Sequence, residues 1–88
     1  MPGVIIEPEQ VREVAEKFRK ASKANQEVVK TLDDAMRDLR DHWQSASQQM
    51  FYRDYKEWNE FAVGSVALLA NIAKELEAIA DRFATADK

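Results

Sequence analysis

Residues that break helices are almost absent from the middle of this chain. The 88 residues include only 2 Gly and 2 Pro, and the stretch from Glu9 to Val63 contains neither. Because Gly and Pro are the residues that most disfavour a helix interior, this stretch can form helix with little interruption. The chain also has no Cys and 1 His, so the usual ligands for structural zinc and iron–sulfur clusters are missing. The sequence therefore predicts a helical protein with very little scope for catalysis.

The first half of the chain has an amphipathic pattern with steps that alternate between three and four residues. We expect a helix over about 8–40, beginning at Pro8, because proline lacks the N–H that stays unpaired at the first helical position. Asn25 is the one amide in the pattern, and it either fixes the helix register or is a tolerated, partly exposed residue. The positions predicted to face inward are Val11, Val14, Phe18, Ala21, Asn25, Val28, Leu32, Ala35 and Leu39.

A second pattern of the same kind predicts a helix over about 47–84. The heptad phase is lost between the two helices, where small polar residues cluster, so we place a turn at about 41–46 and a short tail at 85–88. No alternating apolar run suitable for a strand occurs in either helical stretch. The predicted fold is all-α, an antiparallel two-helix hairpin that forms one domain over residues 1–88. The apolar positions of the second helix are Phe51, Tyr55, Trp58, Ala62, Ser65, Leu69, Ile72, Leu76, Ile79 and Phe83.

The second helix carries more apolar residues than one partner helix can cover. A hairpin covers only one face of each helix, and large exposed apolar patches usually mark interaction sites. We therefore predict that two chains dimerise into a four-helix bundle. The residues expected at the dimer interface are Trp58, Phe61, Val66, Leu68, Leu69 and Ile72.

Chemistry at other polar clusters is less favoured than a solvated helix surface. Asp38 and His42 could share a metal at i, i+4, but two ligands do not complete a site. The acidic run of Asp33, Asp34, Asp38 and Asp41 is expected to be solvated, because acid–base work would need a shielded pocket, which a thin hairpin lacks. We therefore expect no enzyme activity, metal or cofactor. Basic residues around Lys20 alternate with acidic ones, and the net charge is −3, so nucleic-acid binding is not expected. The longest uncharged run, from Phe61 to Ala73, is too short for a stable membrane span, and no signal peptide is visible.

Trp43-Gln44-Ser45 occupies the predicted turn, and Phe83-Ala84-Thr85-Ala86-Asp87 stands just before the last residue, Lys88. Taken together, the chain length, the two helices, this turn and this tail resemble the WXG-hundred family of ESAT-six-like proteins. The family turn reads Trp-any-Gly, whereas this chain has Ser45, which adopts positive φ less readily than glycine. The family export signal reads Tyr, three residues, then an acid. Phe83 and Asp87 keep the aromatic ring and the acid but lose the hydroxyl.

The resemblance implies a small protein that bacteria export through a type VII (ESX) secretion system without a cleaved signal peptide. It implies a homodimer, or a heterodimer with a related hairpin protein, as the exported species. It further implies that the secretion ATPase reads Trp43 and Ser45 in the turn of one subunit together with Phe83 and Asp87 in the tail of the other. The secreted protein would act as an effector or as an escort for a co-secreted partner. The alternative is a cytoplasmic helical adaptor or scaffold that is not exported.

Overall fold

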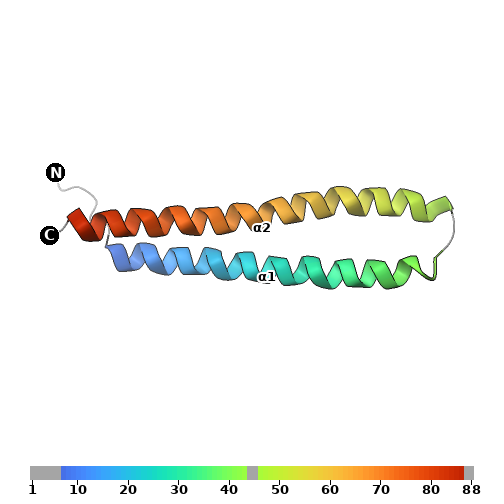
Figure 1. The fold of residues 1–88 in the computed structure, drawn as a ribbon, viewed down its shortest axis with the longest axis horizontal. Coiled ribbons are helices and arrows are strands. Elements are labelled where there is room, and N and C mark those ends of the chain that lie inside the picture. The colour runs from blue at the N-terminus through green and yellow to red at the C-terminus, as the bar shows by residue number, and fades with distance from the viewer. Residues whose placement is uncertain (1–6, 44–45, 87–88) are drawn as a thin grey trace.

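The computed structural model describes residues 7–43 and 46–86, and these form two long helices. Helix α1 spans Pro8–Arg40 and helix α2 spans Ala46–Ala86, with no strand in the described ranges. The helices run antiparallel side by side, so the start of α1 lies near the end of α2 (Figure 1). The predicted all-α hairpin is confirmed.

The hairpin is a thin rod. It measures 65 × 21 × 15 Å and has a radius of gyration of 19.9 Å, whereas a compact domain of this length has a radius of gyration of about 12 Å. The rod is one helix pair thick, so each helix has a single neighbour to pack against. A large part of both helix surfaces therefore remains uncovered in the single chain.

Local sequence signals fix where α1 begins and ends. Pro8 is its first residue, and the carbonyl of Glu7 accepts hydrogen bonds from the N–H groups of Gln10 and Val11 at 3.0 and 3.2 Å. Arg37 and Arg40 occupy the last turn, where positive charge is favourable because of the helix dipole. These signals set the length of α1, which in turn sets the length of the rod.

Small residues form the centre of the contact between the two helices. The buried residues are Ala15, Ser22 and Val29 on α1 with Ala73 and Ala80 on α2. Small side chains let helix axes approach closely, because the distance between packed helices depends on the residues at the contact. Among the described residues, no large side chain is fully buried. The hairpin thus closes on small residues and keeps most of its large apolar side chains at the surface.

The apolar pattern on α1 faces a different direction from the one predicted. The buried residues Ala15, Ser22 and Val29 follow a heptad spacing that lies one position beyond Val14 and Val28, both of which are exposed. The positions predicted to face inward that are exposed in the hairpin are Val14, Ala21, Asn25, Val28, Leu32, Ala35 and Leu39. The prediction that these residues pack inside the hairpin is wrong, because the hairpin contact uses the heptad positions next to them, which Ala15, Ser22 and Val29 occupy. Asn25 is exposed in the single chain, which agrees with the second of its two predicted roles, a tolerated and exposed residue.

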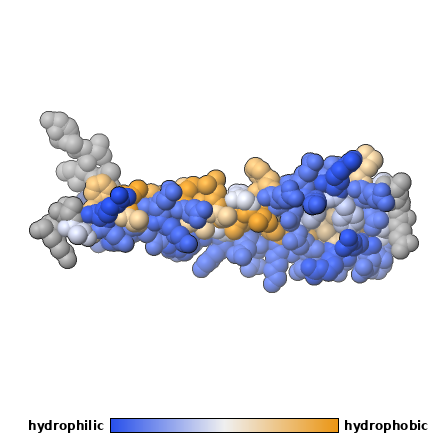
Figure 2. All heavy atoms as spheres, turned by 45° about the horizontal axis from the view of Figure 1, so that its top comes forward, coloured by the Kyte–Doolittle hydropathy of each residue, from blue (hydrophilic) through white to orange (hydrophobic). Residues whose placement is uncertain are grey.

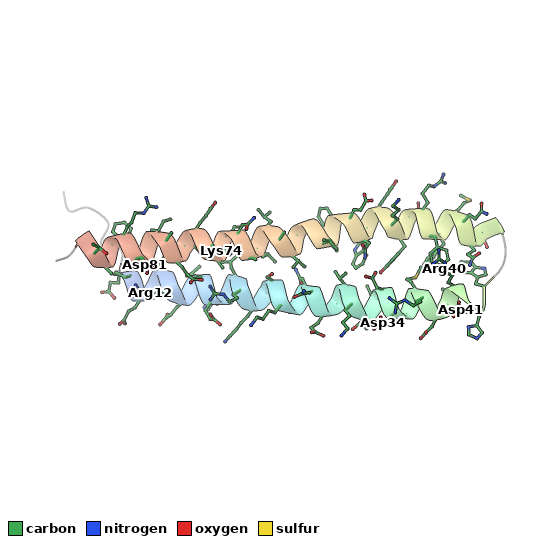
Figure 3. All side chains as sticks on the ribbon, viewed as in Figure 1. Arg12, Asp34, Arg40, Asp41, Lys74 and Asp81 are labelled. Carbon is green, nitrogen blue, oxygen red and sulfur yellow. The ribbon has the colours of Figure 1, made fainter. Side chains whose placement is uncertain are left out.

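Polar contacts join the two helices at intervals along the rod. Near the chain ends, Arg12 and Asp81 form an ion pair with a nitrogen–oxygen distance of 3.1 Å (Figure 3). Further along, Arg19 pairs with Glu77. Near the middle, the hydroxyl of Ser22 donates a 2.8 Å hydrogen bond to the carbonyl of Val66. Exposed ion pairs contribute little stability, typically about 0–1 kcal/mol, so register depends more on the small-residue contact.

Candidate interaction surface

Large apolar side chains are exposed along one side of the hairpin. On α2, Phe61 is 76% exposed and Leu68 is 60% exposed, and Trp58 is also exposed. On α1, Val28 and Leu32 are exposed as well. We call these five residues the apolar face. Four of them, all except Leu68, lie between the middle of the rod and the turn. Further apolar side chains are exposed elsewhere: on the side in view in Figure 2 they gather over the half of the rod nearer the chain ends, with hydrophilic ones over the half nearer the turn.

A shallow groove joins the two helices on the apolar face. It has a volume of about 190 Å³, and its lining includes Val28 of α1 together with Trp58 and Phe61 of α2. Two uncharged polar residues, Asn25 and Ser65, line the same groove. Both helices therefore contribute to one continuous surface, which is the geometry needed for packing against a second helical hairpin.

The opposite side of the hairpin is polar. Val63 and Val66 line a separate groove there, together with charged residues that include Lys30, Asp34 and Arg37. Val66 belongs to the predicted interface set, and the structure places it in this charged groove, apart from the groove that Trp58 and Phe61 line. The two sides of the rod thus differ strongly in their chemistry.

The six residues predicted at a dimer interface are distributed unevenly. Trp58, Phe61 and Leu68 are exposed on the apolar face, and Leu69 and Ile72 are half-buried. The apolar pattern of α1 includes Val28 and Leu32 and predicts that they pack inside the hairpin, whereas both are exposed. Their role at the surface could not be recognised from periodicity, which gives a face of a helix but not the element that covers it.

The exposed area of the chain exceeds that of a compact monomer. The hairpin exposes 7112 Å², against about 5,300 Å² for a typical folded monomer of 10.1 kDa. The excess is about 1,800 Å², whereas a standard protein interface buries about 800 Å² on each partner. The excess exposed area is therefore large enough to be covered by a partner protein of similar size.

The turn brings aromatic residues of both helices together. Trp43 follows α1 and is half-buried, and its ring lies 5.5 Å from the ring of Phe51, measured between centroids. The guanidinium of Arg40 lies over the Tyr52 ring at 5.8 Å from its centroid. The other predicted turn-motif residue, Ser45, lies outside the described residues. The described part of the turn is thus a packed aromatic end to the rod.

The end of α2 holds one of the two predicted export-signal residues. Phe83 is 39% exposed, and α2 continues past it to Ala86. The hydroxyl of Thr85 donates a 2.9 Å hydrogen bond to the carbonyl of Asp81, which in turn pairs with Arg12 through its carboxylate. Asp87 lies outside the described residues. The exposed ring of Phe83 is therefore presented from an ordered helix that is tied to α1.

A polar network that no sequence motif predicts crosses the hairpin near the turn. The hydroxyl of Tyr55 donates a hydrogen bond to the carboxylate of Asp33, and the amide of Asn59 donates another at 2.8 Å. Burial raises the pKa of the Tyr55 phenol, and the Asp33 hydrogen bond raises it further. The sequence predicted a solvated acidic run that included Asp33. Its half-buried position against α2 shows that this is wrong for Asp33 but holds for the exposed Asp34.

The described residues hold no group of three or more His, Cys, Asp or Glu side chains placed to bind a metal. His42 uses its ring Nδ1 in a 2.9 Å contact with the backbone carbonyl of Asp38, so the two residues meet through the backbone and not as paired side-chain ligands. Within the described ranges, neither helix is apolar enough over a sufficient length to cross a membrane. The arrangement supports association through apolar packing.

The sequence was compared with models of known protein families. The model of the WXG100 (WXG-hundred) family, described as proteins of 100 residues with WXG, matches residues 3–88. This chain belongs to the WXG100 family. The match covers both helices and the turn, so the resemblance that the sequence suggested is confirmed. Among curated proteins, none matches the chain significantly.

Solved structures of WXG100-like secretion proteins have the same fold. The secreted protein EsxB of Bacillus anthracis is 25% identical, with full coverage of both chains and a TM-score of 0.86. Its P67A mutant is 26% identical over 97% of this chain and 96% of that one, with a TM-score of 0.89. EsxA of Geobacillus thermodenitrificans is 25% identical over 97% of this chain and 92% of that one, with a TM-score of 0.84. This chain is thus a member of the WXG100 family of proteins associated with type VII secretion.

Proposed function

We propose that this WXG100 protein is exported by a bacterial type VII secretion system as one half of a four-helix bundle, and that it acts as an effector or as an escort for a co-secreted partner. The observation that carries the proposal is the apolar face, on a chain whose family model matches nearly all of its length. Exposed apolar surface on this scale is unfavourable in water. A second hairpin packed on it would complete a core that one chain cannot form.

The shape of the rod supports an export signal shared between two chains. Trp43 lies at the turn and Phe83 lies near the other end of α2, so within one chain they lie near opposite ends of a rod 65 Å long. A receptor that reads both regions together needs two chains that run in opposite directions. In that arrangement the turn of one chain, with Trp43 and Ser45, lies beside the tail of the other, with Phe83 and Asp87. The secretion ATPase is the proposed receptor.

The proposal is tested by measuring export of Phe83→Ala. We expect the secreted fraction to fall about tenfold, which corresponds to losing roughly 1.4 kcal/mol of receptor binding. Arg82→Ala is the matched control, because Arg82 is the exposed neighbour of Phe83 on the same helix. Immunoblots of culture supernatant and cell lysate give the secreted fraction, in strains with and without the secretion ATPase. Circular dichroism checks that both variants keep their helix content.

Three results would contradict the proposal in different ways. Export of Phe83→Ala at the level of the unchanged protein would show that the tail is not the signal. Export that persists without the secretion ATPase would exclude a type VII route. If the unchanged protein never leaves the cell, the cytoplasmic adaptor is the better description, and the apolar face would then serve a partner inside the cell.

A further inference from the structure

Another groove on the polar side of the rod lies near the turn and is lined by three cationic side chains. It has a volume of about 400 Å³, and its lining includes Arg37 and Arg40 of α1 with Lys56 of α2. We call it the turn groove. Among the described residues, it shares no lining residue with the groove of the apolar face. A hairpin packed on the apolar face therefore leaves the turn groove open.

The positive charge of the turn groove is only partly balanced within the chain. Arg37 pairs with Asp34 at 3.4 Å, and both side chains are exposed. No carboxylate of the described residues forms an ion pair with Arg40 or Lys56. The one carboxylate that lines the groove, Asp33, already accepts two hydrogen bonds from α2. Three cations against one carboxylate leave the lining with a net charge of +2, which favours an anionic ligand.

Contacts between the helices hold the walls of the turn groove in place. The hydroxyl of Tyr52 donates a 2.9 Å hydrogen bond to the carbonyl of Met36, and the guanidinium of Arg40 lies over the Tyr52 ring. A guanidinium that stacks on a ring keeps its N–H edge available for a carboxylate. Side chains that are already held lose little freedom when a ligand binds. The turn groove is therefore formed before any ligand arrives.

The turn groove continues into the charged groove toward the middle of the rod. Asp33 and Arg37 line both grooves, and the charged groove has a volume of about 780 Å³ with Val63 and Val66 in its lining. Together the two grooves follow α1 over residues 26–40, a length of roughly 21 Å. About six residues of extended chain fit this length, whereas a single phosphate group would fill only a small part of it.

We propose that the two grooves bind a short segment of the co-secreted partner, with acidic side chains at Arg40 and Lys56 and apolar side chains at Val63 and Val66. This inference rests on the proposed function, since it names where an escort holds its partner. Carboxylates complement the cations near the turn, and apolar side chains complement the valines nearer the middle. Because the grooves lie away from the apolar face, a four-helix bundle can bind this segment while its own core stays intact.

Fluorescence polarisation with a synthetic peptide tests the proposal on the full chain. The labelled probe has about eight residues, with glutamates in one half and leucines in the other. The groove variant combines Arg40→Gln with Lys56→Gln. The matched control combines Lys74→Gln with Arg82→Gln, which changes the net charge equally at exposed residues of α2 nearer the chain ends (Figure 3). We expect the groove variant to bind the probe about tenfold more weakly, as for the loss of two exposed ion pairs, and the control to bind it within about twofold of the unchanged protein. Circular dichroism checks that both keep their helix content.

Two further probes test the chemistry of the segment. A peptide with serines in place of the leucines should bind about tenfold more weakly, because Val63 and Val66 lose their apolar contact. Equal binding of this peptide would overturn the placement of the segment along both grooves. Inorganic pyrophosphate added at about the concentration of the protein should leave the labelled probe bound, since it reaches only the cations. Displacement of the probe by pyrophosphate at that concentration would overturn the peptide segment and assign the turn groove to a small anion.

The absence of probe binding would overturn the inference, as would an equal loss of binding in the groove variant and its control. The export assay keeps this result separate from the proposed function, because the groove variant retains Phe83 and should be exported normally. A chain that is exported but binds no peptide leaves the proposed function intact. A chain that binds the peptide through the groove but is not exported refutes the proposed function and leaves the groove assignment standing.

Discussion

Truncation of the most exposed aromatic side chain gives a quantitative test of the interface. Phe61 is 76% exposed in the single hairpin. A phenylalanine presents about 200 Å², so a partner that covers the exposed part removes about 150 Å² from water, worth at most about 4 kcal/mol. Alanine keeps part of that contact, so we expect Phe61→Ala to lose about 2 kcal/mol per chain. In a homodimer the two copies of Phe61 together would lose about 4 kcal/mol, or roughly a thousandfold in Kd.

The assay is size-exclusion chromatography with light scattering over a dilution series. We expect the unchanged protein to stay dimeric at concentrations where Phe61→Ala has become monomeric. Val63→Ala is the matched control, because Val63 is also an exposed apolar residue of α2, at 51%, but lines the charged groove on the opposite side. If Val63→Ala dissociates as readily as Phe61→Ala, the apolar face is not the interface. If Phe61→Ala stays dimeric throughout the series, the area argument is refuted.

Two further predictions concern residues near the turn. Removing the phenol in Tyr55→Phe should lower the free energy of unfolding by about 1–2 kcal/mol in urea at pH 8, because Asp33 loses a charged hydrogen bond. Burial raises the pKa of Tyr55 from 10.0 in the folded state, so this contribution is present below pH 10 and is lost as the pH rises through the raised pKa. The difference in free energy of unfolding between the unchanged protein and Tyr55→Phe should therefore shrink at alkaline pH. A difference that stays constant with pH would contradict the hydrogen bond from Tyr55 to Asp33. The double variant Asp38→Ala with His42→Ala should change stability by less than about 0.5 kcal/mol and leave export unchanged, since both side chains are exposed. A loss of export would point to a function at this cluster.

The hairpin could be predicted from the sequence because its causes are local. The lack of Gly and Pro over most of the chain permits long helices, and the loss of heptad phase near Trp43 marks the turn. Proline at the start of α1 is a signal that acts within one turn of helix. The chain length, the helix pattern, the Trp43-Gln44-Ser45 turn and the Phe83 tail together suggest the family, which the family model confirms.

The interaction surface could be predicted only in part. The excess of apolar residues on α2 predicts that a partner covers them, and Trp58, Phe61 and Leu68 are exposed in the hairpin. That these residues lie at a dimer interface stays a prediction. The outward direction of Val28 was missed, because an apolar position on a helix carries no information about which element will cover it. Asp33 was missed for a similar reason, since its partners Tyr55 and Asn59 are more than twenty residues away in the sequence.

The amino-acid sequence by itself determined that this chain forms two helices, where they turn, and that their apolar surface exceeds what one hairpin can bury. Only the tertiary structure decided which apolar residues close the hairpin and which remain for a partner. The physical reason is packing: Ala15 and Ala73 let the helices approach closely. The face of α1 that closes the hairpin carries Val29, so Val28 is left on the outer face, and the large side chain of Phe61 is exposed on α2. Periodicity is a property of one helix, whereas burial depends on the shape of two helices together.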